Sequence, residues 1–211
     1  MTWDAILFDL DGTLWNATHV TAKIWPGVLV NHPEIHRTMD LETIQGYMGH
    51  TNEELASILF PELPFGKGYA LMLEASAMEN LLLAREGGQI FEGLFPTLEK
   101  LAEKYPLGII SNCQSGYIEA FLEYHKAGHL FRDFTCSGDT GQTKAANIRM
   151  LMERQGYRHP VYVGDTAHDA EAAKEVGCDF LWAAYGFGTV PEEMRCGRLD
   201  TPDDIFKYLP R

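Results

Sequence analysis

The sequence predicts an α/β protein with a doubly wound, mostly parallel sheet and a helical domain inserted after the first strand. Short apolar runs alternate with stretches of helical spacing over most of the chain, which favours βαβ units. The region near residues 18–87 breaks this alternation, because it has several helical patterns and no convincing strand. A chain of 211 residues is long enough for one large domain that carries an insertion.

Five short apolar runs are the expected strands, since each is mainly apolar and lies close to turn residues. They cover residues 5–8, 107–110, 133–136, 161–163 and 179–182. The stretches with helical spacing predict helices over residues 94–104, 117–126, 144–155 and 167–176. Strand and helix therefore alternate as in a parallel sheet covered by helices.

The interrupting region is predicted to be a helical domain. Its clearest helices cover residues 53–60 and 69–85 and are rich in Leu, Ala, Met and Glu. Gly87 and Gly88 form a plausible hinge back to the sheet. We therefore expect a core domain of residues 1–16 and 88–211 and an α-helical cap domain of residues 17–87.

Composition excludes several functional classes. The chain is 45% hydrophobic and 22% charged, and no segment approaches the roughly 18 apolar residues of a membrane span. With 17 Lys and Arg against 30 Asp and Glu, the net charge of −13 disfavours nucleic-acid binding. The start has no positive region before a long apolar stretch, and the four cysteines are irregularly spaced. We expect a cytoplasmic protein with reduced thiols.

Two carboxylates, Asp9 and Asp11, directly follow the first expected strand in the segment Asp-Leu-Asp-Gly-Thr. The C-terminal edge of an open α/β sheet is where such folds bind ligands. Neighbouring carboxylates repel each other unless a cation or a shared proton compensates. A hard cation such as Mg²⁺ fits oxygen ligands best, and the alternative is a helix cap or an acidic turn.

A second acidic pair, Asp165 and Asp169, follows the expected strand over residues 161–163. A second strand thus brings carboxylates to the same edge of the sheet. If a helix begins near Thr166, Asp169 lies in its first turn, where the helix dipole also favours a negative charge.

Three polar residues are candidates for phosphate binding. Ser111 and Asn112 follow a third expected strand, where a hydroxyl and an amide suit hydrogen bonds to phosphate oxygens. Lys144 has the charge to neutralise a phosphate at a helix start. The alternatives are a turn or an N-cap for Ser111 and Asn112 and a solvated surface position for Lys144.

These motifs, in this order, resemble those of the haloacid dehalogenase superfamily of hydrolases. The segment from Asp9 to Thr13 is similar to the first motif, Ser111 to the second, Lys144 to the third, and Asp165 with Asp169 to the fourth. The helical insertion resembles the cap of the phosphoglycolate phosphatase and β-phosphoglucomutase branch. The resemblance covers nearly the whole chain.

The resemblance implies a two-step phosphoryl transfer. Asp9 is the expected nucleophile that forms an aspartyl phosphate, and Asp11 is the expected general acid and then general base. Mg²⁺ is the implied cofactor, with ligands from Asp9, the Asp11 backbone carbonyl and Asp165, and support from Asp169. The superfamily's dehalogenases lack an acidic group at the position of Asp11, so a phosphate ester is the favoured substrate.

Substrate specificity is expected in the cap, where Gly49, His50 and Thr51 form a small, polar turn. The alternative is an ordinary helix connection in which Thr51 caps a helix and Glu54 completes a capping box. His19, Lys23 and Arg37 are weaker candidates. Trp15 is a bulky departure from the family pattern, and it either narrows the pocket or packs at the hinge.

The sequence therefore predicts a Mg²⁺-dependent phosphatase of small phosphorylated metabolites, active as a monomer or homodimer. One alternative is a phosphomutase of the β-phosphoglucomutase type, although the spacing of His19 from Asp9 does not match that branch. Another is a non-catalytic regulatory or receiver-like module. Receiver modules lack a helical insertion after the first strand.

Overall fold

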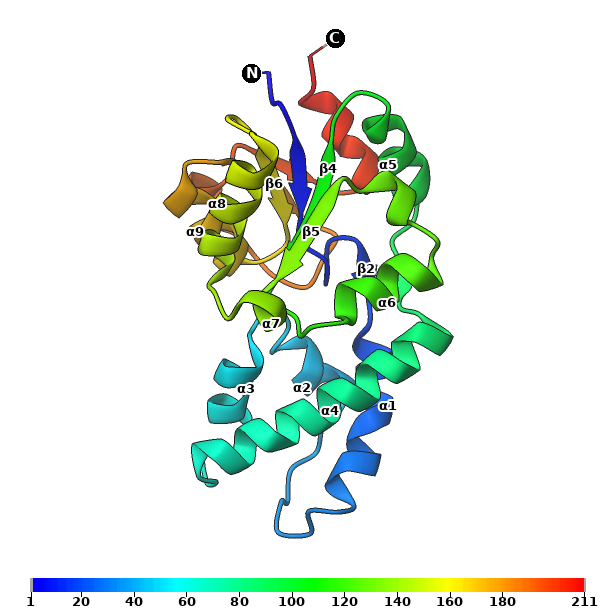
Figure 1. The fold of residues 1–211 in the computed structure, drawn as a ribbon, viewed down its shortest axis with the longest axis vertical. Coiled ribbons are helices and arrows are strands. Elements are labelled where there is room, and N and C mark those ends of the chain that lie inside the picture. The colour runs from blue at the N-terminus through cyan, green and yellow to red at the C-terminus, as the bar shows by residue number, and fades with distance from the viewer. Residues whose placement is uncertain (1, 211) are drawn as a thin grey trace.

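A computed structural model describes residues 2–210, and a six-stranded parallel sheet forms its centre (Figure 1). The strand order is β5-β4-β1-β6-β7-β8. The bounds are β1 (Ile6–Phe8), β4 (Leu107–Ser111), β5 (Asp133–Cys136), β6 (Val161–Gly164), β7 (Asp179–Ala183) and β8 (Gly197–Leu199). The predicted α/β class and parallel sheet are confirmed. Strand β8 was not predicted, because its three residues include only one buried side chain.

Helices cover both faces of this sheet. On one face, α5 (Leu94–Ala102) and α6 (Tyr117–Tyr124) pack in the same apolar cluster as Ile6 and Phe8 of β1. On the other face, α8 (Lys144–Gln155) and α9 (Ala167–Val176) pack with Leu7. Alternate side chains of a strand point to opposite faces, so β1 contributes to both clusters. The sheet is doubly wound, as predicted.

Four shorter segments complete the sheet region. Helix α7 (Ser137–Thr140) follows β5, and the segments of 3₁₀ helix are Gly128–Leu130, Glu192–Met194 and Pro202–Lys207. Helices α5 and α6 each end two residues earlier than the spacing predicted.

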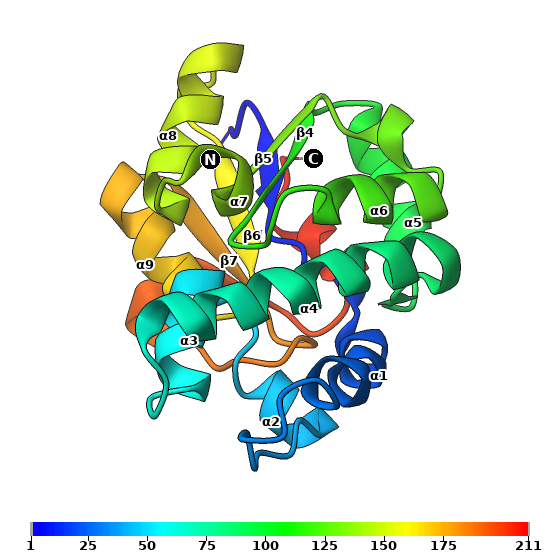
Figure 2. The same ribbon diagram turned by 60° about the horizontal axis from the view of Figure 1, so that its bottom comes forward.

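The region between Asn16 and Gln89 is helical, as expected. It contains α1 (Thr18–Leu29), α2 (Leu41–Gln45), α3 (Asn52–Leu59) and α4 (Phe65–Glu86). These helices share a separate apolar cluster with Trp25, Leu59 and Phe60 in its interior. Figure 1 shows them at one end of the sheet, away from both termini, and Figure 2 shows α4 running across this end.

Two short strands join the helical region to the sheet region. Strand β2 (Trp15–Asn16) precedes α1, and β3 (Gln89–Ile90) follows α4. They pair antiparallel, with Trp15 opposite Ile90, so the chain leaves and returns on neighbouring strands. Within residues 2–210, no helix is both long and apolar enough to cross a membrane.

Candidate active site

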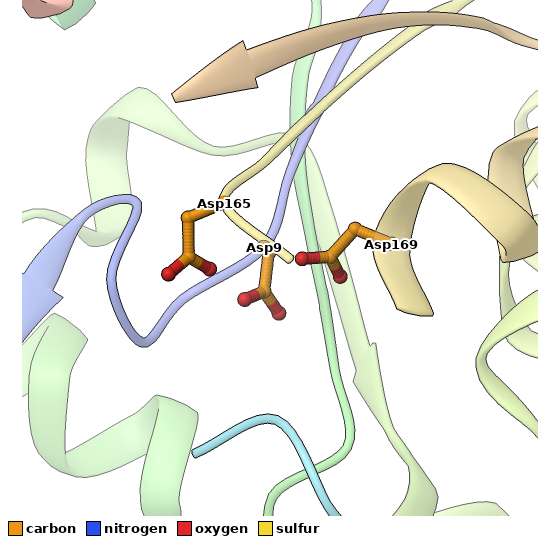
Figure 3. Close-up of side chains that lie close together, drawn as sticks. All are labelled: Asp9, Asp165 and Asp169. Atoms are coloured by element: carbon orange, nitrogen blue, oxygen red, sulfur yellow. The ribbon is translucent and has the colours of Figure 1, made fainter. Parts of the chain in front are cut away.

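Three buried carboxylates lie together at the C-terminal edge of the sheet. Asp9 directly follows β1, Asp165 directly follows β6, and Asp169 lies in the first turn of α9. One oxygen of each lies within 4.8 Å of the others, and Figure 3 shows the three groups close together, with Asp169 pointing toward Asp9. Adjacent parallel strands thus bring Asp9 and Asp165 to one point, as the sequence predicted.

Lys144 connects two of these carboxylates. Its Nζ donates to Asp9 Oδ1 at 2.8 Å and to Asp169 Oδ1 at 2.5 Å. The lysine side chain is only 5% exposed, so the alternative of a solvated surface position is wrong. Lys144 is the first residue of α8, whose N-cap Thr143 accepts from the backbone N–H of Ala146.

Backbone and capping contacts hold the other two carboxylates in place. Asp169 forms a capping box with Thr166, whose backbone N–H donates to Asp169 Oδ2 at 2.9 Å. Asp169 therefore lies in the first turn of α9, where the helix dipole favours a negative charge, while its other oxygen contacts Lys144. Asp165 Oδ2 accepts from the backbone N–H of Phe187 at 2.8 Å. Asp165 Oδ1 is buried and has no hydrogen-bond partner within the described chain.

The loop after β1 fits closely against Asp165. Gly12 has a φ of +75°, and a Cβ added to it would lie 2.2 Å from Asp165 Oδ2. Any side chain at this position would therefore both strain the backbone and displace the carboxylate. The glycine of the first motif is required by this close approach.

The electrostatics of the cluster favour a bound cation. Burial, and then the charge of Asp169, raise the pKa of Asp9 to about 7, although Lys144 opposes this shift. Burial raises the pKa of Asp165 well above its usual range, and the charges of Asp169 and Asp9 add to the effect. Burial alone would lower the pKa of Lys144, but Asp169 and Asp9 raise it well above normal. Three carboxylates thus face one ammonium group, and Asp165 Oδ1 is free to bind. The oxygen donors present fit Mg²⁺.

Asp11 lies in different surroundings, outside the cluster of three carboxylates. Its Oδ1 accepts from Trp15 Nε1 at 3.0 Å and from the hydroxyl of Tyr117 at 2.8 Å. Burial and the charge of Asp9 raise the pKa of Asp11 well above its usual range, whereas the hydrogen bond from Tyr117 lowers it. The carboxyl group is therefore suited to hold a proton. The metal contact expected from its backbone carbonyl stays a prediction.

Ser111 and Asn112 lie at the end of β4, on the wall of a cavity above Asp9 and Asp11. Ser111 is buried, and its Oγ accepts from the backbone N–H of Cys113 at 3.3 Å. The amide of Asn112 donates to the Gly49 carbonyl at 2.8 Å and accepts from the Ser137 hydroxyl. Asn112 thus connects the sheet to the helical region, and its predicted role toward phosphate stays a prediction.

The turn of Gly49, His50 and Thr51 was predicted either to enter the site or to cap a helix, and different residues of the turn do each. Gly49 and His50 line the cavity. Thr51 instead is the N-cap of α3, and its capping box with Glu54 is present. The structure therefore gives Thr51 the capping role, and the residues it places in the cavity are the two before it.

Three side chains near Asp11 extend what the sequence indicated. Trp15 is fully buried, with its ring edge-on to Tyr117, so both packing and a polar contact explain this departure from the family pattern. The contact of Tyr117 with Asp11 could not be predicted, because an aromatic residue at the start of a helix is expected to pack in the apolar core. Glu79 of α4 also lines the cavity. Its spacing from Met72 and Ser76 on the buried face of the helix is the signal that could have found it.

The comparisons with known proteins agree with this fold and site. The model of the haloacid dehalogenase-like hydrolase family matches residues 6–183. The chain belongs to this family. A phosphoglycolate phosphatase of Aliivibrio fischeri is 26% identical over 97% of this chain and 93% of its own length.

Solved structures share the whole fold. A haloacid dehalogenase-like family hydrolase of Streptococcus pneumoniae aligns with a TM-score of 0.79 at 23% identity, over 98% of both chains. The YfnB protein of Bacillus subtilis, whose crystal structure is bound to magnesium, aligns with a TM-score of 0.72 at 17% identity over 99% of both chains. These structures share the fold, and membership of the haloacid dehalogenase-like hydrolase family makes the chain an enzyme of the hydrolase class.

Proposed function

We propose that this protein is a Mg²⁺-dependent phosphatase that hydrolyses small phosphate monoesters through an aspartyl phosphate on Asp9. The observation that carries the proposal is the pair of unlike carboxyl groups at the end of β1. Asp9 is bound by Lys144, whereas Asp11 lies in surroundings that favour its protonated form. Membership of the hydrolase family and the name of the Aliivibrio fischeri relative support a phosphate ester as substrate.

In the first step, a carboxylate oxygen of Asp9 forms a bond to phosphorus while the bond from phosphorus to the leaving alcohol oxygen breaks. Asp11 donates its proton to that oxygen, so the alcohol leaves in neutral form. Trp15 and Tyr117 donate to Asp11 Oδ1 and so fix the orientation of this carboxyl group.

In the second step, water attacks phosphorus and the bond from phosphorus to Asp9 breaks. Asp11, now ionised, accepts the proton of the attacking water and returns to its starting state. Inorganic phosphate is released and the Asp9 carboxylate is regenerated. Lys144 and Ser111 are proposed to stabilise the charge on the phosphoryl oxygens through both steps.

Asp9, Asp165 and Asp169 are the residues proposed to hold Mg²⁺, directly or through water, with the Asp11 backbone carbonyl as a further ligand. The ion would neutralise the excess negative charge of the site and of the phosphate. The charge imbalance around Asp165 supports this assignment, since one of its oxygens is buried without a partner among residues 2–210.

Residues 17–87 are proposed to act as a cap over a core of residues 1–16 and 88–211. The paired strands β2 and β3 support this division, because both connections pass through one short ribbon. A cap that encloses the cavity would exclude water during the first step. Gly49 and His50 are proposed to contact the substrate there.

The test is phosphate release from a panel of phosphate esters that includes phosphoglycolate, sugar phosphates and p-nitrophenyl phosphate, with Mg²⁺ or with EDTA. The expected result is Mg²⁺-dependent release that is lost in Asp9→Asn. Release from no compound would contradict the proposal. Turnover that depends on a sugar 1,6-bisphosphate would instead favour the phosphomutase.

A further inference from the structure

The cavity over Asp9 and Asp11 indicates which leaving groups the enzyme accepts. Its inner wall is built by the helical region and is mainly apolar, with side chains from α1 to α4. Examples are Ile24, Trp25, Met39, Ile44, Leu59 and Met72. A leaving group that fills this space must contact apolar surface.

The polar part of the wall built by the helical region includes an acidic side chain. Glu79 of α4 is a cavity residue that is only 9% exposed. Its carboxyl oxygens accept from the hydroxyl of Thr21 and, at 2.8 Å, from the amide of Gln114. These contacts hold the carboxyl group in place. In either protonation state, it offers no positive charge to a ligand.

No lysine or arginine lines this cavity in the part of the chain that the structure describes. Lys144 lies beneath Asp9 and is already paired with two carboxylates. Lys23 pairs with Glu86 at 2.5 Å, and both side chains are about half exposed at the surface. The basic group in the described wall is the imidazole of His50, whose Nδ1 lies 3.2 Å from the Tyr47 carbonyl oxygen.

An anionic leaving group would be poorly accommodated here. A carboxylate or a second phosphate would lose its hydration against apolar side chains, which is costly without a paired cation. It would also approach the carboxyl group of Glu79, and like charges at an interface are strongly unfavourable. An uncharged alcohol incurs neither cost.

We propose, on the basis of the proposed phosphatase function, that the substrate's leaving group is a mainly apolar alcohol without negative charge, and that Glu79 selects against anionic ones. This differs from the substrate in the name of the Aliivibrio fischeri relative, because glycolate carries a carboxylate. Glu79 is thus a specificity-determining residue of the cavity.

The test uses three phosphate esters whose leaving groups have the same heavy-atom skeleton. They are 2-phosphoglycolate, which is anionic, its uncharged amide 2-phosphoglycolamide, and the apolar isobutyl phosphate. We expect the kcat/KM of the wild-type enzyme for phosphoglycolate to be at least 100-fold below the values for the two uncharged esters. A kcat/KM for phosphoglycolate equal to or above theirs would overturn the proposal.

A pair of variants isolates the contribution of Glu79. At pH 8, Glu79→Gln should reduce the ratio of kcat/KM for isobutyl phosphate to kcat/KM for phosphoglycolate, here called the gap, at least tenfold. Glu86→Gln removes a carboxylate from the exposed end of the same helix and should leave the gap unchanged. The two leaving alcohols differ in acidity, but this difference affects the wild type and the variant alike. The change in the gap between the two enzymes therefore reports on Glu79. A gap that Glu79→Gln leaves as wide as in the wild type would refute the role of this residue.

The wild-type comparison needs no variant to fold, so the substrate class can be tested even if Glu79→Gln is unstable. p-Nitrophenyl phosphate, with its reactive leaving group, reports on the hydrolytic chemistry alone. No release from this ester would contradict the proposed phosphatase, whereas its hydrolysis together with a preference for phosphoglycolate would contradict only the substrate class.

Discussion

Asp9 and Asp11 are two residues apart at the end of one strand, yet they have opposite surroundings. Asp9 contacts Lys144 and lies beside two further carboxylates, Asp165 and Asp169. Asp11 instead accepts hydrogen bonds from two neutral donors, Trp15 and Tyr117. The residues around Asp9 are therefore suited to bind charged groups, and the residues around Asp11 are suited to keep its carboxyl group protonated.

The same contrast separates the sheet edge from the cavity wall above it. The sheet edge is a dense group of titratable side chains whose oxygen donors fit a cation. The wall from α1 to α4 is mainly apolar and contains Glu79. In the proposed mechanism, the phosphoryl group and the leaving group would therefore meet different environments, so that chemistry and specificity would depend on different parts of the chain.

The largest effect should come from the charged side. Asp9→Asn removes the nucleophile while keeping the shape of the side chain, and kcat should fall at least about 10⁴-fold. The measurement is phosphate release with Mg²⁺, alongside circular dichroism to show that the variant is folded. An Asp9→Asn enzyme with the wild-type rate would refute the assigned nucleophile.

Asp11→Asn should give a large but substrate-dependent loss. For alkyl phosphates, loss of the general acid should lower kcat/KM, which reports only the steps up to release of the alcohol, about 10²- to 10⁴-fold. For p-nitrophenyl phosphate the loss should be much smaller, since p-nitrophenolate leaves without a proton. Equal losses for both substrates would show that Asp11 does not protonate the leaving group.

Asp165→Asn should separate stability from activity. In metal-free enzyme, the change removes a buried carboxylate that Asp169 and Asp9 repel, while the amide oxygen can still accept from Phe187. The melting temperature should therefore rise, by roughly 2–4 °C for each kcal/mol gained. Mg²⁺ should stabilise the wild type and restore activity after EDTA treatment, but do neither in Asp165→Asn. If the metal-free variant melts at a lower temperature than the metal-free wild type, repulsion among the three carboxylates does not destabilise the metal-free site.

Tyr117→Phe should have a moderate effect that appears in the pH profile. The hydrogen bond from Tyr117 lowers the pKa of Asp11, so its loss should raise that pKa further. Because Asp11 must be protonated to act as an acid, the alkaline limb of kcat/KM should move to higher pH, with a loss of about 3- to 10-fold at the optimum. Tyr124→Phe, on the exposed part of the same helix, is the control. If the alkaline limb does not move, Tyr117 contributes to packing and does not affect the pKa of Asp11.

The smallest effect concerns the stability of the cavity wall. Burial raises the pKa of Glu79, so its folded form holds a proton more tightly than its unfolded form. That stabilisation is complete below the unfolded pKa and is lost as pH rises through the folded pKa. The melting temperature of Glu79→Gln relative to the wild type should therefore increase from pH 4.5 to pH 8, on the order of 2 °C. Glu86, whose pKa Lys23 lowers, should give the opposite trend in Glu86→Gln. A pH-independent difference for Glu79→Gln would contradict this account.

Much of the sheet edge could be predicted from the sequence. Asp9 and Asp165 each follow a short apolar run, and parallel strands place such positions at one edge. Lys144 was predicted beside them through the family resemblance. The short pairing of β2 with β3 could not be predicted, because two-residue strands carry no period.

The cavity wall was harder to predict for a different reason. Glutamate is usually a surface residue, so the sequence gives no reason to place Glu79 in a cavity. Tyr117 occupies a position where a helix commonly has an apolar core residue. Their positions beside Asp11 depend on how α6 packs on the sheet and how α4 packs on α6, which no local pattern describes. The turn before α3 shows the same limit, since Thr51 fits both a cap and a site residue until the capping box is seen.

The alternation of strands and helices, the helical insertion and the polar residues at or just after the ends of β1, β4 and β6 could all be predicted from the sequence. These features are local, since hydrophobic periodicity and turn residues encode them over a few positions. The tertiary structure alone decided that Asp11 contacts Trp15 and Tyr117, that Asn112 binds Gly49 and that Glu79 enters the cavity. Those contacts join residues up to 106 positions apart, and only the packing of whole elements brings them within hydrogen-bond distance.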